Sequence, residues 1–160
     1  MKEINIQSTF YIFETIDELP EDIFLLMQKA KEARTKAYAP YSNFTVGAAI
    51  LLDNNQVVLG NNQENASYPS GLCAERTAIY YAAANYPNSK ILKIAIIAGS
   101  LVNDTPQPIP PCGACRQAIA EYEVKQETPI EIYFMGTSGN VLKSNSLKNL
   151  LPLIFDKSQL

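Results

Sequence analysis

The sequence predicts an α/β domain in which helices cover a mixed sheet of about five strands, and three observations support this prediction. Segments with helical spacing of apolar residues alternate along the chain with short apolar runs typical of strands. The run from Ile91 to Ala98 is rich in isoleucine, as expected of a strand buried on both faces. The length of 160 residues, 47% of them hydrophobic, fits one domain with a full core, so residues 1–160 are treated as a single domain.

The N-terminal region is expected to contain an extended segment followed by a helix. Apolar and polar residues partly alternate over residues 3–14, which indicates a strand or an extended segment. Pro20 precedes two acidic residues, a favourable start for a helix. Apolar residues at helical spacing follow, so we predict a helix over residues 20–38 that ends before Pro40.

A hairpin and a loop are expected next. Apolar runs at 46–52 and 57–59 flank the turn-forming sequence Asp-Asn-Asn at 53–55, which predicts two paired strands. Residues 60–71 are polar and contain several asparagines, so we expect a loop there.

The remaining elements alternate between helices and strands. A helix is predicted over 73–85, before Pro87, and a second over 112–122, after a proline-containing loop at 102–111. Further strands are expected at residues 130–135 and 141–142, on either side of a Ser-Gly turn. A single helical turn is expected over 146–150, and no repeat, low-complexity segment or linker is visible.

Composition excludes several classes of function. A net charge of −3 and a pI near 5 argue against binding to nucleic acid, which requires clustered Lys and Arg. No apolar stretch approaches the roughly 18 residues that a membrane helix needs, and no signal peptide is visible. Three cysteines cannot all pair within one chain, so we expect free or metal-bound thiols in a reducing compartment and a cytoplasmic protein.

The chemistry is expected between Cys73 and Cys115, because all three cysteines lie in two short segments and the chain has no histidine. Cys112 and Cys115 are three residues apart, so on a helical turn both sulfurs can chelate one ion. With Cys73 they form a set of three thiolates, which can bind one zinc ion per chain and leave a fourth tetrahedral position open, as catalytic sites do.

Two features near the cysteines favour a catalytic site. Glu75 lies two residues after the first cysteine and can move protons to and from a water activated by the metal. Three thiolates give the zinc cluster excess negative charge, which would weaken the activation of water. Two helix N-termini, together with Arg76 and Arg116, could offset that charge.

Two simpler interpretations of the cysteines remain open. Cys112 and Cys115 could form a redox pair, but this leaves Cys73 and Glu75 without a role, and the preceding loop does not resemble a thioredoxin-like strand entry. A structural zinc site normally has four protein ligands, and a chain with three cysteines and no histidine would have to recruit a carboxylate.

The pattern Cys-x-Glu followed at a distance by Pro-Cys-x-x-Cys is that of zinc deaminases in which the glutamate is the acid and base and not a ligand. With three further segments, the chain resembles cytidine deaminases of the small, homotetrameric, three-cysteine type. The resemblance covers residues 33–155, and residues 1–19 form an N-terminal extension outside it, with an added strand or a subunit contact as a hypothesis. The similar segments are Tyr41–Ala49, Gly60–Pro69, Cys73–Ile79, Pro111–Gln117 and Leu150–Phe155.

The resemblance implies a three-layer α-β-α sandwich, a homotetramer and a set of site residues. It makes the three cysteines the zinc ligands, Glu75 the proton shuttle and Arg76 a residue that hydrogen-bonds the sulfurs and tunes the metal. The substrate-binding residues that it implies are Phe44, Asn62, Glu64, Ala66 and Phe155. Asn62 and Glu64 would bind the sugar hydroxyls, and Phe155 would reach the base from a neighbouring subunit.

The implied reaction is the zinc-dependent hydrolytic deamination of cytidine or deoxycytidine to uridine or deoxyuridine plus ammonia, a step of pyrimidine salvage. Considered from the residues alone, Asn62 and Glu64 could equally belong to a surface loop, and Phe44 and Phe155 to the core. Two alternatives stay open: a deaminase of a cytosine-nucleoside analogue such as blasticidin S, and a non-catalytic assembly protein stabilised by zinc.

Overall fold

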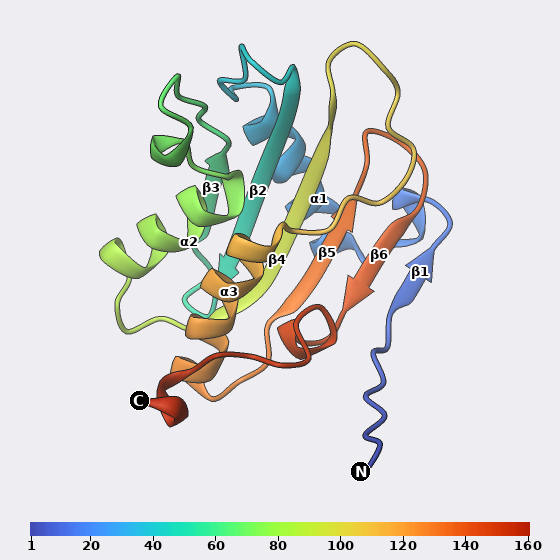
Figure 1. The fold of residues 1–160 in the computed structure, drawn as a ribbon. Helices are drawn as coiled ribbons and strands as arrows, with labels where there is room; N and C mark the ends of the chain where they lie inside the picture. The colour runs from blue at the N-terminus through green and yellow to red at the C-terminus, as the bar shows by residue number, and fades with distance from the viewer.

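The fold consists of one six-stranded sheet with α1 on one face and α2 and α3 on the other (Figure 1). A computed structural model describes residues 1–160. The predicted three-layer α/β architecture is confirmed, with six strands where about five were expected. The strands are β1 (Tyr11–Phe13), β2 (Phe44–Leu52), β3 (Val57–Asn61), β4 (Ile91–Ser100), β5 (Glu131–Met135) and β6 (Val141–Ser144), and the helices are α1 (Glu21–Arg34), α2 (Ala74–Asn85) and α3 (Gly113–Gln126).

The sheet is mixed, with the order β1-β6-β5-β4-β2-β3. β2 and β3 form the predicted antiparallel hairpin, and β4 pairs with the other edge of β2. β4 and β5 are parallel, and the connection between them contains α3. A parallel pair needs such a crossover, and this crossover carries two of the three cysteines to the sheet.

The sixth strand comes from the N-terminal extension. β1 pairs antiparallel with β6, with Ile12 opposite Leu142. It is shorter than the extended segment predicted over residues 3–14, and residues 1–10 are exposed and outside any strand. Phe13, Ile16 and Leu19 pack against the core beneath α1, so the extension covers one side of the domain.

α1 ends at Arg34 and not near Tyr38, as the spacing of apolar residues had predicted. The reason is a long-range contact, because the Tyr38 amide donates to the Asn62 carbonyl at 3.0 Å and the Tyr38 carbonyl accepts from the Glu64 amide at 2.9 Å. Tyr38 therefore lies in an extended bridge with residue 63 instead of in the helix. This bridge holds the segment after β3 beside the segment before β2.

Two apolar clusters hold the three layers together. The larger has 18 buried residues and joins α2 and α3 to the sheet, while the smaller has 11 and joins α1 to the opposite face. α2 lies very close to β3 at Gly60. A Cβ atom at that position would lie only 2.4 Å from the carbonyl oxygen of Ala74. A glycine at that position lets the first turn of α2 approach the sheet.

None of the helices combines the length and the apolar character that crossing a membrane requires.

Candidate active site

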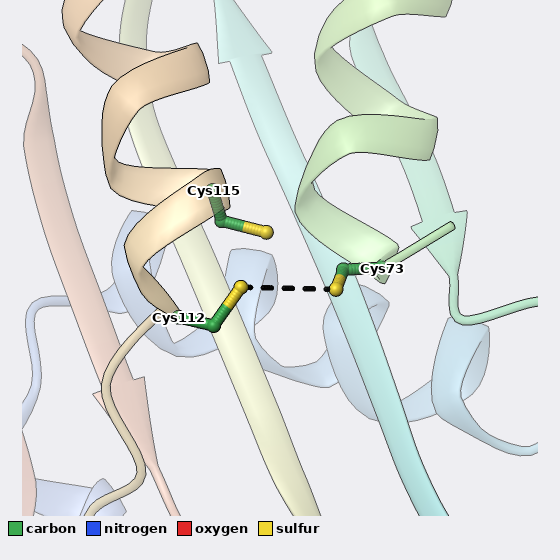
Figure 2. A group of neighbouring side chains, drawn as sticks. All are labelled: Cys73, Cys112 and Cys115. Atoms are coloured by element: carbon green, nitrogen blue, oxygen red, sulfur yellow. Dashed lines mark hydrogen bonds between the residues drawn. The ribbon is translucent and has the colours of Figure 1, made fainter. Parts of the chain in front are cut away.

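The three cysteines converge from two helices that lie side by side (Figure 2). Their Sγ atoms all lie within 4.8 Å of one another, and those of Cys73 and Cys112 are 3.9 Å apart. Cys115 is fully buried, Cys73 is half-buried and Cys112 is exposed. The cluster is therefore anchored in the core at one sulfur and open to solvent at another.

Both helices begin at a cysteine. Cys73 is the N-cap of α2 and Cys112 the N-cap of α3, and both have extended backbone conformations. The carbonyl of Cys73 accepts from the Thr77 amide at 2.9 Å, and that of Cys112 accepts from the Arg116 amide at 2.9 Å. Neither N-cap thiol takes a hydrogen bond from a backbone amide of its own helix, so the positive ends of both helix dipoles are left facing the sulfur cluster.

The geometry fits one zinc ion per chain. With Zn–S bonds of about 2.3 Å, two thiolates of a tetrahedral site lie about 3.8 Å apart. The separation between Cys73 and Cys112 is close to that value, and Cys115 needs only a small adjustment. Thiolates are soft ligands that suit zinc, and no fourth cysteine or any histidine exists to close the site.

In the absence of a metal, Cys73 is the cysteine whose thiolate form is favoured. The Cys115 thiol, which is placed to donate to Cys73, and the guanidinium of Arg76 lower the pKa of Cys73 to about 5. The same interaction and burial raise the pKa of Cys115. A divalent ion would take the place of these protons, because metal binding requires deprotonated sulfur.

Glu75 is a buried carboxyl beside the sulfur cluster. It lies in the first turn of α2 and is only 5% exposed. Burial raises the pKa of its carboxyl, and the negative charge of Cys73 raises it further. A raised pKa favours the protonated form of the carboxyl, which is the form that can donate a proton as a general acid.

The two arginines near the cysteines have different partners. Arg76 donates from Nη2 to Sγ of Cys73 at 3.6 Å, while its Nε is buried without a hydrogen-bond partner. Arg116 instead donates to the carbonyls of Pro111 at 2.8 Å and Leu150 at 2.9 Å. Arg76 therefore places its positive charge beside the cluster, whereas Arg116 ties the C-terminal segment to the loop before α3.

An open cleft of about 510 Å³ reaches the sulfur cluster at Cys73. Cys73 and Arg76 line one part of it, and Asn62 and Glu64 line another. Both ends of the Asn62 carboxamide are used by β2, because Nδ2 donates to the Phe44 carbonyl at 2.9 Å and Oδ1 accepts from the Val46 amide at 2.7 Å. The volume of the cleft is in the range of small-molecule sites, about 300–1,000 Å³.

The other predicted substrate-binding residues lie outside the lining of this cleft. Phe44 is the half-buried first residue of β2, and Ala66 is exposed in the loop after β3. Phe155 is 61% exposed on the C-terminal segment, and its carbonyl accepts from Gln117 Nε2 on α3 at 2.8 Å. The cleft thus brings Asn62 and Glu64 together with Cys73 and Arg76, whereas Phe44, Ala66 and Phe155 do not line it.

Ser42 is one of several cleft residues to which the sequence analysis assigned no role. Ser42 lines the cleft, and its hydroxyl donates to the Glu64 carboxylate and accepts from the Phe44 amide. The available signal was a serine followed by an asparagine just before a predicted strand, a combination typical of many turns. That signal does not reveal contact with a carboxylate 22 residues away.

Comparison with known proteins identifies similar sequences over most of the chain. Residues 20–128 match a family model described as the cytidine and deoxycytidylate deaminase zinc-binding region. A cytidine deaminase from Halalkalibacterium halodurans is 40% identical over 131 residues, which are 82% of this chain and 92% of that protein. One from Sporosarcina psychrophila is 37% identical over 139 residues, which are 87% of this chain and 95% of that protein.

Solved structures of similar sequence share the fold. A crystal structure of cytidine deaminase from Burkholderia pseudomallei superimposes with a TM-score of 0.71 at 38% identity, and the match covers 86% of this chain and all of that chain. One from Mycobacterium tuberculosis gives a TM-score of 0.65 at 33% identity over 85% of this chain and 98% of that chain. The extension at residues 1–19 lies outside the matched family region.

Proposed function

Because the chain belongs to the cytidine and deoxycytidylate deaminase family, we propose that it hydrolyses cytidine and deoxycytidine to uridine and deoxyuridine with release of ammonia. The observation that carries the proposal is the convergence of three thiols, a buried carboxyl and an open cleft. The family match places zinc in this site, and the three cysteines fit one ion per chain. The alternatives of a blasticidin deaminase and of a non-catalytic assembly protein are not favoured, since the relatives are cytidine deaminases.

Cys73, Cys112 and Cys115 would hold the metal, and the remaining steps belong to the protein side chains. When bound, zinc would lower the pKa of a water molecule in its open fourth position. Glu75 accepts a proton from the attacking water and passes it to N3 of the cytosine ring. After attack at C4, Glu75 takes the remaining proton from the oxygen added at C4 and donates it to the departing amino group, which leaves as ammonia while C4 becomes a carbonyl.

Three other side chains support the reaction. The Arg76 guanidinium beside Cys73 offsets part of the negative charge of three thiolates. Asn62 and Glu64 hold the sugar hydroxyls in the cleft, so the cytosine ring extends towards the cysteines. The cleft has no cluster of cations that could bind a phosphate group, and the Glu64 carboxylate would repel a phosphate. Both features favour a nucleoside over a nucleotide as the substrate.

The proposed function is tested by measuring zinc per chain, the loss of cytidine absorbance and the release of ammonia. We expect close to one zinc per chain and turnover of cytidine and deoxycytidine. A protein that contains zinc but deaminates neither nucleoside would favour the assembly alternative. A panel that adds deoxycytidine monophosphate and blasticidin S separates the nucleoside deaminase from its relatives.

The position of Phe155 supports a homotetramer in which a neighbouring subunit completes each site. Its side chain is 61% exposed and does not line the cleft of its own chain. An exposed aromatic on a segment tied down through Gln117 is suited to insertion into a partner. A reducing compartment such as the cytoplasm suits the site, because its ligands are free thiols.

Subunit mixing tests this arrangement. Phe155→Ala and Glu75→Gln chains are each expected to be poorly active, whereas co-assembled mixtures recover activity. In a mixed tetramer, some sites combine an intact Glu75 with a Phe155 from the other chain. Mixtures no more active than the average of the two separate variants would contradict a shared site, and sedimentation would report the oligomeric state.

A further inference from the structure

The turn before β2 places Ser42 between two residues of the proposed substrate site. The Ser42 hydroxyl donates to Oε1 of Glu64, and it accepts from the Phe44 amide at 3.0 Å. The directions follow from the partners, because an amide N–H can only donate and an ionised carboxylate can only accept. The single hydroxyl proton is therefore committed to Glu64.

The backbone fixes Ser42 in this position. Asn43 has a φ of 54°, a left-handed conformation that asparagine tolerates better than most residues. The Asn43 carbonyl accepts from the Leu101 amide at 2.8 Å, and its amide donates to the Ala39 carbonyl at 3.1 Å. Both contacts hold the turn independently of the Ser42 side chain.

The Glu64 carboxylate is held by three protein donors. In addition to the Ser42 hydroxyl, Oε2 accepts from the amides of Tyr41 at 2.9 Å and Ser42 at 3.3 Å. A carboxylate has about four lone-pair positions, so roughly one remains for a ligand. The Ser42 hydroxyl and then the Tyr41 amide lower the pKa of Glu64, which keeps the acceptor ionised.

The same turn connects Glu64 to Asn62. Phe44, whose amide is bound by Ser42, uses its carbonyl to accept from Asn62 Nδ2 at 2.9 Å. A continuous chain of hydrogen bonds thus runs from Glu64 through Ser42 and Phe44 to Asn62. Both residues proposed to contact the sugar are held from the start of one strand, β2.

We propose that Ser42 is a positioning residue that holds the Glu64 carboxylate ready to accept a hydrogen bond from a sugar hydroxyl of the nucleoside. Glutamate side chains otherwise lose several rotatable degrees of freedom on binding, and a preformed acceptor avoids that cost. The inference rests on the proposed function and assigns to it a determinant of sugar recognition. Ser42 itself does not touch the reacting atoms.

The test compares cytidine with 2′,3′-dideoxycytidine, which lacks both hydroxyls. For Ser42→Ala we expect kcat/KM to fall about tenfold with cytidine, which corresponds to about 1.4 kcal/mol, and less than about twofold with the dideoxynucleoside. Ser42→Thr, which keeps the hydroxyl, should recover most of the loss. Equal losses with both substrates would show a general structural role and overturn the proposal.

A double-mutant cycle gives a second readout. If Ser42 acts through Glu64, the variant with both Ser42→Ala and Glu64→Ala should be no slower on cytidine than Glu64→Ala alone. Additive losses would overturn the proposal. Ser70→Ala is the matched control, because Ser70 is exposed close to the cleft but does not line it and its hydroxyl makes no hydrogen bond to Glu64.

A measurement without turnover separates this inference from the proposed function. NMR titration of the Glu64 carboxyl should show a pKa below the usual range, and Ser42→Ala should move the pKa upward. An unchanged pKa would overturn the positioning role. A wild-type protein that turns over neither nucleoside would refute the proposed function, while the titration would still decide whether Ser42 holds Glu64.

Discussion

Arg76 donates a hydrogen bond from Nη2 to the Sγ atom of Cys73 across 3.6 Å, so the thiol that caps α2 has a cation directly beside it. The two residues are three apart on one helix, and this contact therefore depends only on local geometry. Three thiolates on one zinc ion would leave a net negative charge. Arg76 supplies a counter-charge that no other side chain bonded to these sulfurs provides.

Arg76→Gln should weaken the metal site. The substitution removes the charge but keeps a polar side chain, and loss of such a partner typically costs about 10- to 100-fold in metal affinity or activity. Competition with a chromogenic chelator measures zinc affinity, and kcat/KM is measured at saturating zinc. Arg76→Lys keeps the charge but lacks the planar fork, so an intermediate effect is expected. Unchanged affinity in Arg76→Gln would mean that the contact does not tune the metal.

Glu75→Gln should retain the fold and the zinc but lose about 10²- to 10⁴-fold in kcat, which is the range typical of general acid–base catalysis. Glutamine has nearly the same volume, so it fits the 5% exposed position in the first turn of α2. Circular dichroism and zinc content provide the controls. A variant with near-normal kcat would remove Glu75 from the proton transfers.

Local sequence patterns predicted the metal centre well. Cys73 and Cys112 cap the two helices that the apolar spacing indicated, and both helix boundaries agree to within a residue or two at their starts. The hairpin from β2 to β3 was equally visible, because the turn residues lie between two apolar runs. These features depend on residues close in sequence, where propensity and spacing dominate.

Features that depend on distant residues were not predicted. α1 ends early because Tyr38 pairs with residues 62 and 64, and the role of Ser42 depends on Glu64. The sixth strand was uncertain, because Tyr11–Phe13 is an edge strand that needs β6 as its partner. The spacing of residues in one short segment does not contain such information.

Removal of zinc should abolish activity without unfolding the chain. The two apolar clusters contain 18 and 11 buried residues and do not depend on the metal. After treatment with a chelator, we expect an intact far-UV circular dichroism spectrum, no turnover and recovery on addition of zinc. Zinc should raise Tm, with a stabilisation of about 4 kcal/mol when its free concentration is 1,000 times Kd. Equal recovery with magnesium would contradict a thiolate site.

Glu123 is expected to contribute to stability and not to catalysis. Although only 6% exposed, its carboxylate accepts from the Ile130 amide at 2.8 Å, the Leu147 amide at 2.9 Å and the Ser146 hydroxyl at 2.6 Å. It therefore joins α3 to the start of β5 and to the turn after β6. Glu123→Ala leaves these donors without a partner and should lower the free energy of unfolding by about 2–4 kcal/mol.

Glu123→Gln is the matched control. Its carbonyl oxygen can still accept from both amides, which share Oε2, and its NH₂ group can donate to the Ser146 hydroxyl. We therefore expect a smaller loss than with alanine. Denaturant unfolding measures both variants, and equal losses would indicate that the charge and not the hydrogen bonding is responsible.

Truncation should separate two parts of the N-terminal extension. Removing residues 1–8 deletes only exposed residues and should leave the free energy of unfolding unchanged to about 0.5 kcal/mol. Removing residues 1–19 also deletes β1 and uncovers the core beneath α1, where Phe13, Ile16 and Leu19 pack. Burying a large apolar side chain stabilises by about 1.5–3 kcal/mol, so the longer truncation should cost several kcal/mol.

The position of β1 predicts what this truncation does to activity. β1 is at one edge of the sheet, whereas the cleft residue Asn62 directly follows β3 at the opposite edge. At a temperature where both truncated proteins remain folded, kcat/KM for cytidine should therefore match that of the full chain. If the protein lacking residues 1–19 is folded but inactive, the extension must contribute to an active site. Because the extension lies far from the cleft of its own chain, that active site would belong to a neighbouring subunit. Measuring kcat/KM beside the sedimentation coefficient distinguishes this result from a simple loss of stability.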